Sequence, residues 1–447
     1  MDAETLDALY VEHVATLERG AGVALESTGW DAVVIHSGSL IKRSEFDDQY
    51  WPLRPVPHWQ HWLPLAEPDC ALVIRPGARP ILLRSTAATF WEKPPLPETL
   101  VFFDVFDVTG LERLAQVADY LPRQRVAFVG QDAAVATAWG IPHEALRPAA
   151  LIDALDALRV NKTAYEVACI AEANRRARAG HEMLRRAFRD GDVSELDLHL
   201  LYLQATSQDD WETPYKNIIA LGANAATLHH VAYGKAVAAR GVESLLVDAG
   251  ATCRGYCADV TRTWVKGKGA AADCFGHLVA AMDDLQLRLC AAARVGVPYE
   301  FLHDQSHREV AAALRDVGLV RASVDEAVGT GMTRAFFPHG LGHSLGLQTH
   351  DVGCALRKPR ADNRYLRNTR DIEPGQIFTI EPGVYFIEEL LGPLRSDARS
   401  PAIDWNAVDA IAPLGGVRVE DDVLVVSPDV PVRNLTREHL ASGGGVA

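Results

Sequence analysis

Two aspartates at the ends of strand-like runs are the strongest constraint in this sequence. Asp248 follows the apolar run 244–247, which is typical of a buried strand, and Asp259 begins a second β-like run. Gly250 and Gly255, which lie between them, allow the chain to fold back as a hairpin. Two partly buried carboxylates brought together in this way raise each other's pKa unless a cation compensates them. Two unrelated acids at strand ends remain the alternative until later residues are considered.

Composition limits the class of protein. The chain has 447 residues, enough for two or three domains, and its net charge of −15 comes without any Lys/Arg block, which argues against a nucleic-acid-binding surface. No run approaches the ~20 apolar residues of a membrane-spanning helix, and the acidic start of the chain lacks the features of a signal peptide. The seven cysteines are scattered without paired spacing. We therefore expect a soluble protein of the reducing cytoplasm.

The pattern of apolar residues predicts two domains. An α/β domain over 1–158 is indicated by a helix at 6–24, strands at 32–36, 71–74, 80–83, 101–103 and 126–129, and helices near 110–121 and 132–138. Thr163 and Glu166 match a capping box at the start of a long helix, which places the boundary just before them. Residues 159–440 then alternate blocks of helices, including 271–295 and 299–316, with strand regions, an α+β pattern. The glycine-rich end, 441–447, is predicted to be a flexible tail.

Aromatic, histidine and proline residues are concentrated in segments 44–52 and 57–62 of the first domain. Their density is greater than a plain connection between strands needs. Such a segment is either a loop held by aromatic packing or a contact surface, and the residues alone leave both readings open.

Three histidines lie close together in a glycine-rich stretch. His339 and His343 are four residues apart, but the surrounding glycines and proline disfavour the regular helix that would place both on one metal ion. One histidine held on a tight turn is the better interpretation. His350 follows seven residues after His343.

Two further carboxylates repeat the pattern of Asp248. Glu381 ends an apolar run, and Glu420 ends an alternating run in which Arg418 shares its face. Four strand-embedded acids and one neutral imidazole would balance two divalent cations. Oxygen-rich ligation with one imidazole favours Mn²⁺, with Co²⁺, Zn²⁺ and Fe²⁺ as alternatives. Two such ions can hold a bridging hydroxide and polarise a substrate oxygen, so the set predicts hydrolysis.

In this order the motifs VDAG, ADVTRT, HGLGH, TIEPG and VRVED resemble the metal set of the pita-bread metallopeptidases. Within that family they are most similar to bacterial Xaa-Pro dipeptidases, also called prolidases, and to the related organophosphorus acid anhydrolases. The resemblance covers nearly the whole chain. It implies a creatinase-like α/β N-terminal domain and an α+β pita-bread catalytic domain.

The resemblance also implies a ligand for each position of a two-metal site. Asp248 would bind one ion through both oxygens, and Asp259 and Glu420 would bridge the two ions. His343 and Glu381 would complete the second ion's shell. Glu381 would also carry a proton from the bridging water to the leaving nitrogen.

On the substrate side, the resemblance assigns two histidines. His229 matches a substrate-side histidine, and His350 matches one that stabilises the tetrahedral intermediate. Arg418 would hold the substrate's carboxylate through its guanidinium fork. Tyr215 and His339 would lie around the same pocket, with His339 behind the metal ligands.

Dimers of this family place an N-terminal loop of one subunit over the partner's site, and segment 47–52 matches that loop. We expect Asp48 to contact the substrate's ammonium group, which would exclude longer peptides, although Asp47 is the neighbouring candidate. Trp91 is expected to line the same small pocket.

The resemblance therefore predicts a homodimeric, Mn²⁺-dependent enzyme that hydrolyses Xaa-Pro dipeptides. The insert 387–394 resembles the dipeptidase branch more than aminopeptidase P. Three alternatives stay open: an aminopeptidase P acting on longer Xaa-Pro peptides, an organophosphorus acid anhydrolase, and a protein of this fold that binds other proteins without metal. All five ligand positions hold an acid or histidine, which argues against the last alternative.

Overall fold

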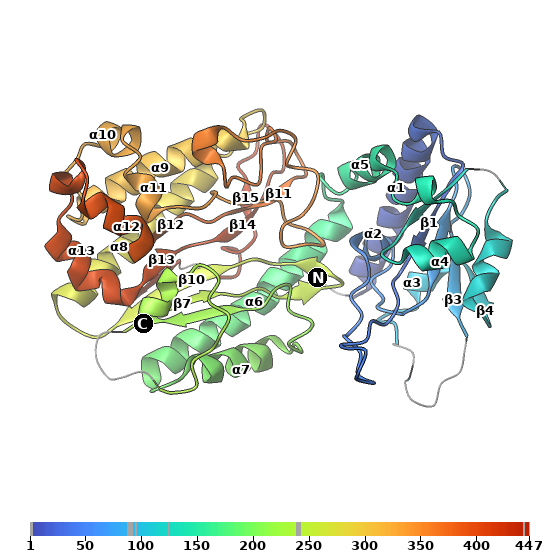
Figure 1. The fold of residues 1–447 in the computed structure, drawn as a ribbon, viewed down its shortest axis with the longest axis horizontal. Coiled ribbons are helices and arrows are strands. Elements are labelled where there is room, and N and C mark those ends of the chain that lie inside the picture. Colours follow the sequence, from blue (N-terminus) through green and yellow to red (C-terminus); the bar gives the residue numbers. More distant parts are fainter. Residues whose placement is uncertain are drawn as a thin grey trace. The chain divides into compact units, whose positions relative to one another are not determined.

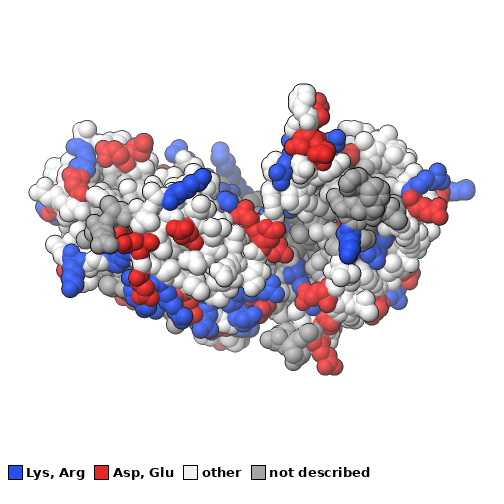
Figure 2. Space-filling view, turned by 90° about the horizontal axis from the view of Figure 1, so that it is seen from below, with Lys and Arg blue, Asp and Glu red and all other residues white. Residues whose placement is uncertain are grey.

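The computed structural model describes residues 3–86, 93, 96–123, 125–237, 243–440 and 443–446. It divides into two compact units, residues 1–168 and 169–447, and each unit is described by itself (Figure 1). Among the described helices, none combines the length and the apolar character that crossing a bilayer requires. Figure 2 shows acidic and basic side chains interspersed over one face of the molecule.

The first unit is built on one mixed sheet. Its strands are β1 (Ala32–His36), β2 (Ala71–Ile74), β3 (Ile81–Ser85), β4 (Asp107–Leu111) and β5 (Val126–Val129), in the order β4-β3-β2-β1-β5. Its helices are α1 (Ala3–Thr28), α2 (Pro57–Gln60), α3 (Val101–Asp104), α4 (Ala133–Ala138) and α5 (Ala149–Ala157), with 3₁₀ turns η1 (Leu114–Tyr120) and η2 (His143–Ala145). β1 pairs with β2 antiparallel and with β5 parallel. The α/β architecture predicted for this part of the chain is confirmed.

One predicted strand of the first unit is wrong. Residues 101–103 form the short helix α3 instead, and the edge strand β4 comes later, at Asp107–Leu111. The amide of Phe103 donates to the carbonyl of Leu100 at 2.9 Å, which closes a helical turn. Three apolar residues in a row fit a buried strand and one turn of a buried helix equally well. The hydrophobic pattern alone therefore does not distinguish the two structures.

The second unit contains helices and short strands. Helix α6 (Ala164–Asp190) begins in the first unit, and α7 (Glu195–Thr206), α8 (Ala270–Ala292), α9 (Tyr299–Asp316), α10 (Val324–Gly329), α11 (Thr333–Phe336), α12 (Glu388–Arg395) and α13 (Trp405–Ile411) follow. The strands are β6 (Ile218–Leu221), β7 (Glu243–Asp248), β8 (Thr252–Cys253), β9 (Tyr256–Cys257), β10 (Thr261–Lys266), β11 (Ile377–Ile380), β12 (Gly383–Tyr385), β13 (Gly416–Arg418), β14 (Asp421–Leu424), β15 (Arg433–Asn434) and β16 (Gly444–Val446). The 3₁₀ turns are η3 (Gly222–Ala226), η4 (Ala361–Asn363), η5 (Ser400–Ala402) and η6 (Ala412–Leu414).

Helices cover both sides of the strands in this unit. On one side, Phe188 of α6 and Tyr202 of α7 pack with Val247 of β7 and Trp264 of β10. On the other side, Val265 of β10 belongs to a larger core that contains α8, α9 and strands β11, β13 and β14 (Figure 1). The period-two alternation of a strand explains why successive residues of β10 enter different cores. The strand ends are thereby held between two rigid layers.

The hairpin predicted around Asp248 is confirmed. β7 and β10 pair antiparallel, with Asp248 opposite Thr261. The connection contains the small ladder β8–β9. It passes so close to itself that a Cβ atom on Gly250 would lie 1.9 Å from the carbonyl oxygen of Ala258, so only glycine fits there.

The capping box predicted at Thr163 and Glu166 is also confirmed, because the amide of Thr163 donates to Glu166 Oε2 at 2.8 Å. The flexible tail predicted over 441–447 needs a correction. Gly444–Val446 form strand β16, which pairs parallel with β10. Gly444 has φ +147°, and a Cβ atom there would lie 2.0 Å from the carbonyl oxygen of Thr263, so glycine permits this close strand contact. From composition alone, the same glycines indicate a flexible tail.

Candidate metal centre

Sheet pairing in the second unit brings together side chains that are far apart in the sequence. Thr261, the first residue of β10, faces Asp248 at the end of β7 and also forms an isolated bridge with Glu420. Glu381 directly follows β11, and Ser344, next to His343, bridges to Phe378 of that strand. The carboxylates predicted at strand ends therefore reach one place from different strands.

His343 lies at the centre of the acidic group. Its Nε2 is 3.4 Å from Asp259 Oδ2, 3.5 Å from Glu381 Oε1 and 4.0 Å from Glu420 Oε1. Its Nδ1 donates to the carbonyl oxygen of Ser344 at 3.1 Å, which leaves Nε2 directed at the carboxylates. A metal-binding histidine is usually oriented in this way, by a hydrogen bond from its other nitrogen.

Asp248 is held by Arg418, although 170 positions separate them. Arg418 Nη2 donates to Asp248 Oδ2 at 2.5 Å, Nη1 donates to the Tyr385 hydroxyl at 2.7 Å, and Nε donates to Thr261 Oγ1 at 3.1 Å. The other oxygen of Asp248, Oδ1, is buried and has no hydrogen-bond partner in the described structure. A buried carboxylate oxygen without a donor is a position where a cation fits.

The electrostatics of the group also point to a cation. Burial, followed by the charges of neighbouring carboxylates, raises the pKa of Glu420 well above its usual range, and burial is also the largest cause that raises the pKa of Asp248. Burial raises the pKa of Glu381 to about 7. Burial disfavours the charged form of His343, yet its bond to Asp259 and the charge of Glu381 raise its pKa to about 9. The carboxylates thus carry more negative charge than the surrounding side chains neutralise.

The donor set fits divalent metal ions. Asp259, His343 and Glu420 each offer a ligand atom within 4.8 Å of the others, and all three are buried. Oxygen-rich sets with one imidazole suit Mn²⁺ and related divalent ions. Asp259, Glu381 and Glu420 therefore lie around His343, and the fifth predicted ligand, Asp248, is held by Arg418. Their individual roles as ligands stay predictions.

The other predicted histidines surround this group. His350 lies 4.4 Å from His343 between ring centroids, with the rings nearly perpendicular. Burial lowers the pKa of His350 to about 4 and that of His339 to about 3, and the charge of His229 contributes to both shifts. His229 is exposed. The charge of His229 therefore reaches both His339 and His350, and His350 lies beside His343.

His339 makes two hydrogen bonds that fix its ring. Its Nδ1 donates to the carbonyl oxygen of Gly340 at 2.8 Å, and its Nε2 accepts from the Tyr385 hydroxyl at 2.8 Å. Tyr215 donates to Asp259 Oδ1 at 2.5 Å. Sequence reasoning missed Tyr385 and Thr261, which both contact Arg418. The only local signal was that each follows a predicted ligand closely in the chain, Thr261 after Asp259 and Tyr385 after Glu381.

Two predicted residues belong to the first unit. Asp48 lies in an exposed segment, where its Oδ1 accepts from the Gln49 side chain at 3.4 Å. Trp91 lies outside the described residues. Their predicted contacts with substrate stay predictions.

The sequence pattern of Metallopeptidase family M24 matches residues 168–427, the part of the chain that carries the acidic group. The chain belongs to metallopeptidase family M24. Residues 8–157 match the family described as Xaa-Pro dipeptidase, N-terminal domain. The M24 assignment makes the protein a metal-dependent peptide hydrolase, and the acidic group lies within the matched residues.

Curated relatives of this M24 protein extend over the whole chain. Xaa-Pro dipeptidase of Aeromonas hydrophila is 39% identical over 442 residues, covering 96% of this chain and 98% of the relative. Xaa-Pro dipeptidase of Pseudoalteromonas haloplanktis is 39% identical over 448 residues, covering 98% and 99%. The predicted resemblance to bacterial Xaa-Pro dipeptidases is confirmed.

Solved structures confirm the predicted fold. Zinc-substituted Escherichia coli aminopeptidase P in complex with product matches with a TM-score of 0.73, at 21% identity over 95% of each chain. Aminopeptidase PepP of Pseudomonas aeruginosa matches with a TM-score of 0.74, also at 21% identity and 95% coverage of each chain. At this identity the likeness concerns the pita-bread fold alone.

Proposed function

We propose that this M24 enzyme hydrolyses Xaa-Pro dipeptides with two bound divalent ions, and that both native ions are Mn²⁺. The relatives that match over nearly the whole chain are Xaa-Pro dipeptidases, which supports the substrate class. The observation that carries the proposal is the convergence of Asp259, Glu381 and Glu420 on His343 Nε2, at 3.4 to 4.0 Å. Four acids with one imidazole favour an oxygen-preferring ion over a thiolate-selected one.

In this proposal the ligands divide between the two ions. Asp248, Asp259, His343, Glu381 and Glu420 would hold the two ions, with Asp248 on the side of one ion and His343 and Glu381 on the side of the other. When bound, the ions lower the pKa of water and polarise the scissile carbonyl. Arg418 keeps the carboxylate of Asp248 in place through its 2.5 Å bond. Tyr215 does the same for Asp259 through its hydroxyl.

The remaining residues act on the substrate. Glu381 passes a proton toward the leaving imide nitrogen, and His350 and His229 donate hydrogen bonds to substrate oxygens. A guanidinium has five N–H donors. The three bonds of Arg418 to Asp248, Thr261 and Tyr385 leave donors that are suited to the substrate's carboxylate. The hydrogen bond between Tyr385 and His339 supports this arrangement from behind.

We also propose a homodimer in the cytoplasm, in which segment 47–52 reaches the partner's site. Phe46 is 100% exposed and Trp51 is 46% exposed, which is unusual for aromatic side chains outside a contact. Asp47 Oδ1 accepts from the amide of Gln49 at 2.9 Å and so closes a turn. Asp48 is therefore the better candidate for binding the substrate's ammonium group.

The direct test is hydrolysis of Ala-Pro by the full-length protein loaded with Mn²⁺. We expect turnover of Ala-Pro and Gly-Pro and little turnover of the tripeptide Ala-Pro-Ala. Preferred cleavage of the tripeptide would instead assign an aminopeptidase P activity. The variant D48N should lower kcat/KM for dipeptides, whereas D47N serves as the matched control. No turnover by a folded, metal-loaded sample would overturn the proposal.

Organophosphate hydrolysis is proposed as a side activity at the same site. A tetrahedral phosphoryl centre resembles the tetrahedral state of amide hydrolysis, and ions that polarise a carbonyl also polarise a phosphoryl oxygen. Comparing kcat/KM for paraoxon and for Ala-Pro tests the order of the two activities. We expect the dipeptide to be the better substrate.

A further inference from the structure

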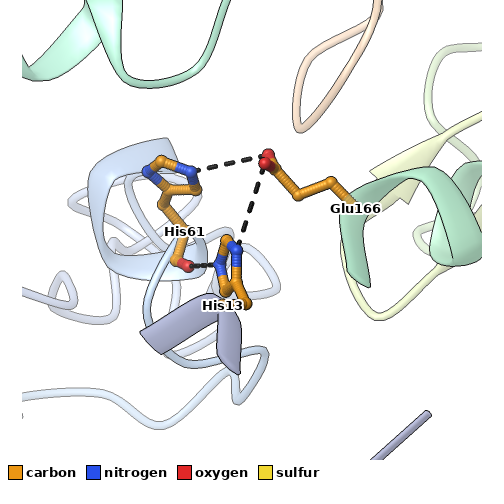
Figure 3. A group of neighbouring side chains, drawn as sticks. All are labelled: His13, His61 and Glu166. Carbon is orange, nitrogen blue, oxygen red and sulfur yellow. Dashed lines mark hydrogen bonds and ion pairs between the residues drawn. The ribbon is translucent and has the colours of Figure 1, made fainter. Parts of the chain in front are cut away.

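The first unit contains a second group of metal-binding side chains, His13, His61 and Glu166, which peptide hydrolysis does not use (Figure 3). They come from α1, from the residue after α2 and from the first turn of α6. All three are buried, with exposed fractions of 1%, 5% and 1%. One ligand atom of each lies within 4.8 Å of the other two.

The ring of His13 has a fixed orientation. Its Nε2 donates to the carbonyl oxygen of His61 at 2.8 Å, so Nδ1 carries the lone pair. That nitrogen accepts a hydrogen bond from Thr163 Oγ1 at 2.9 Å and lies 4.0 Å from Glu166 Oε2. Histidine ligands of metal ions commonly donate their other N–H to a backbone carbonyl in this way. Burial lowers the pKa of His13 to about 4, which keeps the ring neutral at physiological pH.

His61 supplies an independent indication that a ligand is missing. Its Nε2 is buried without a hydrogen-bond partner in the described structure. The nearest acid atom, Glu166 Oε1, is 3.5 Å away, beyond the ~3.2 Å limit of a good N–H···O bond. Figure 3 shows this nitrogen directed at the Glu166 carboxylate. A buried nitrogen in this state costs free energy unless something binds it.

Glu166 provides the negative charge. Its Oε2 accepts from the amide of Thr163 at 2.8 Å, which leaves Oε1 facing His61. Burial opposes ionisation of this carboxyl, but His61, His13 and Lys162 lower its pKa to about 2. Lys162 acts on this carboxyl through its charge, while its ammonium donates to the carbonyl oxygen of Arg159.

We propose that His13 Nδ1, His61 Nε2 and Glu166 Oε1 bind one zinc-class divalent ion in the N-terminal unit. Two imidazoles and one carboxylate are a zinc-type donor set, unlike the acid-rich M24 centre. Ligand atoms in a tetrahedral zinc site lie about 3.4 Å apart, because the bonds are ~2.0–2.2 Å long. The 3.5 Å between His61 Nε2 and Glu166 Oε1 is already close to this value, and one ligand atom of each of the three residues lies within 4.8 Å of the other two. Thr163 Oγ1 or a water would take the fourth position.

The test counts zinc in the full-length protein after chelation and equilibrium dialysis against zinc sulfate. Because zinc is also one of the ions expected to suit the M24 centre, the parent is compared with H61Q and with the matched control H58Q. His58 lies three residues earlier and contacts Asp156 at 2.9 Å, outside the group. We expect H61Q to bind about one equivalent less than the parent and H58Q, and to lose part of the zinc-induced rise in Tm. Ala-Pro turnover should be retained in both variants, which separates this result from failure of the proposed dipeptidase function.

Equal zinc content in H61Q and H58Q would overturn the proposal and leave the three side chains as a hydrogen-bonded brace. If H61Q does not fold, zinc absorption spectroscopy on a D259N/E420Q background keeps the proposal testable. Two imidazole nitrogens around the remaining zinc are expected there. Zinc that is not bound by two imidazole nitrogens would contradict the proposal.

Discussion

The buried carboxylate of Glu195 accepts a hydrogen bond from His230 Nε2 at 2.8 Å, across 35 positions of the chain. The same carboxylate accepts from the amides of Leu221 at 2.9 Å and Gly234 at 2.7 Å, and from the Asn224 side chain at 2.8 Å. One side chain at the start of α7 therefore fixes segment 221–234 at several points. That segment carries His229, next to His230, and His229 is one of the residues proposed to contact the substrate.

Replacing Glu195 with glutamine should loosen this segment. Glutamine keeps the shape but removes the charge and half of the acceptor capacity. Hydrogen bonds to charged groups contribute about 1.5–3 kcal/mol, so we expect kcat/KM for Ala-Pro to fall by roughly 10- to 100-fold. Metal content should not change. The control is E243Q, which alters an ion pair with Lys266 in the same unit. Equal kinetics in E195Q and E243Q would show that the segment positions itself without Glu195.

Asp259 tests the metal centre itself. Its two oxygens contact the Tyr215 hydroxyl and His343, so asparagine at this position removes one charged oxygen from the middle of the group. We expect D259N to lose bound metal and to reduce turnover by about 100-fold or more. Elemental analysis and Ala-Pro hydrolysis measure the two effects. D273N, on the exposed surface of α8, is the control. Two retained metal ions with full turnover would mean that Asp259 has been misassigned.

Gly342 tests the close packing of the turn that holds His343. A Cβ atom there would lie 2.2 Å from the carbonyl oxygen of Thr379 and 2.4 Å from the Tyr299 hydroxyl. We expect G342A to lower the free energy of unfolding by about 1–3 kcal/mol or more. At Gly329 a Cβ atom meets nothing within 4 Å, so G329A should be neutral or stabilise by up to about 1 kcal/mol. Urea unfolding compares the two. A neutral G342A would indicate that the turn has room to shift.

The buried histidines His303 and His307 are expected to make the folded protein less stable in mild acid. Burial lowers the pKa of His303 to about 4 and that of His307 to about 3, against 6.5 when unfolded. The unfolded chain therefore binds more protons below pH 6.5, and stability falls as pH decreases from 6.5 toward these values. At pH 5 each histidine contributes a loss of about 2 kcal/mol.

The measurement is urea unfolding between pH 7.5 and pH 5. H307Q removes one of the titrating rings and should show a shallower pH dependence than the parent. H277Q, on the exposed face of α8, is the control and should follow the parent. Parallel curves for the parent and H307Q would contradict the prediction.

Local patterns in the sequence were sufficient for the elements that carry the site. Alternation and turn residues predicted β7, β10 and the hairpin between them, and Thr163 with Glu166 predicted the start of α6. Strand ends followed by glycine also indicated where the carboxylates lie. These features depend on residues close together in the chain, so a sequence shows them directly. A three-residue run such as 101–103 is too short for this reasoning, and its strand prediction was wrong.

The sequence by itself therefore determined which residue types stand at the strand ends and which family they belong to. Only the tertiary structure decided their partners: Arg418 with Asp248, Tyr385 between Arg418 and His339, and Glu195 with His230. The same is true of His61, whose nitrogen is buried beside Glu166 without a hydrogen bond. These contacts depend on sheet register and helix packing over distances of up to 170 positions, for which the chain carries no local pattern.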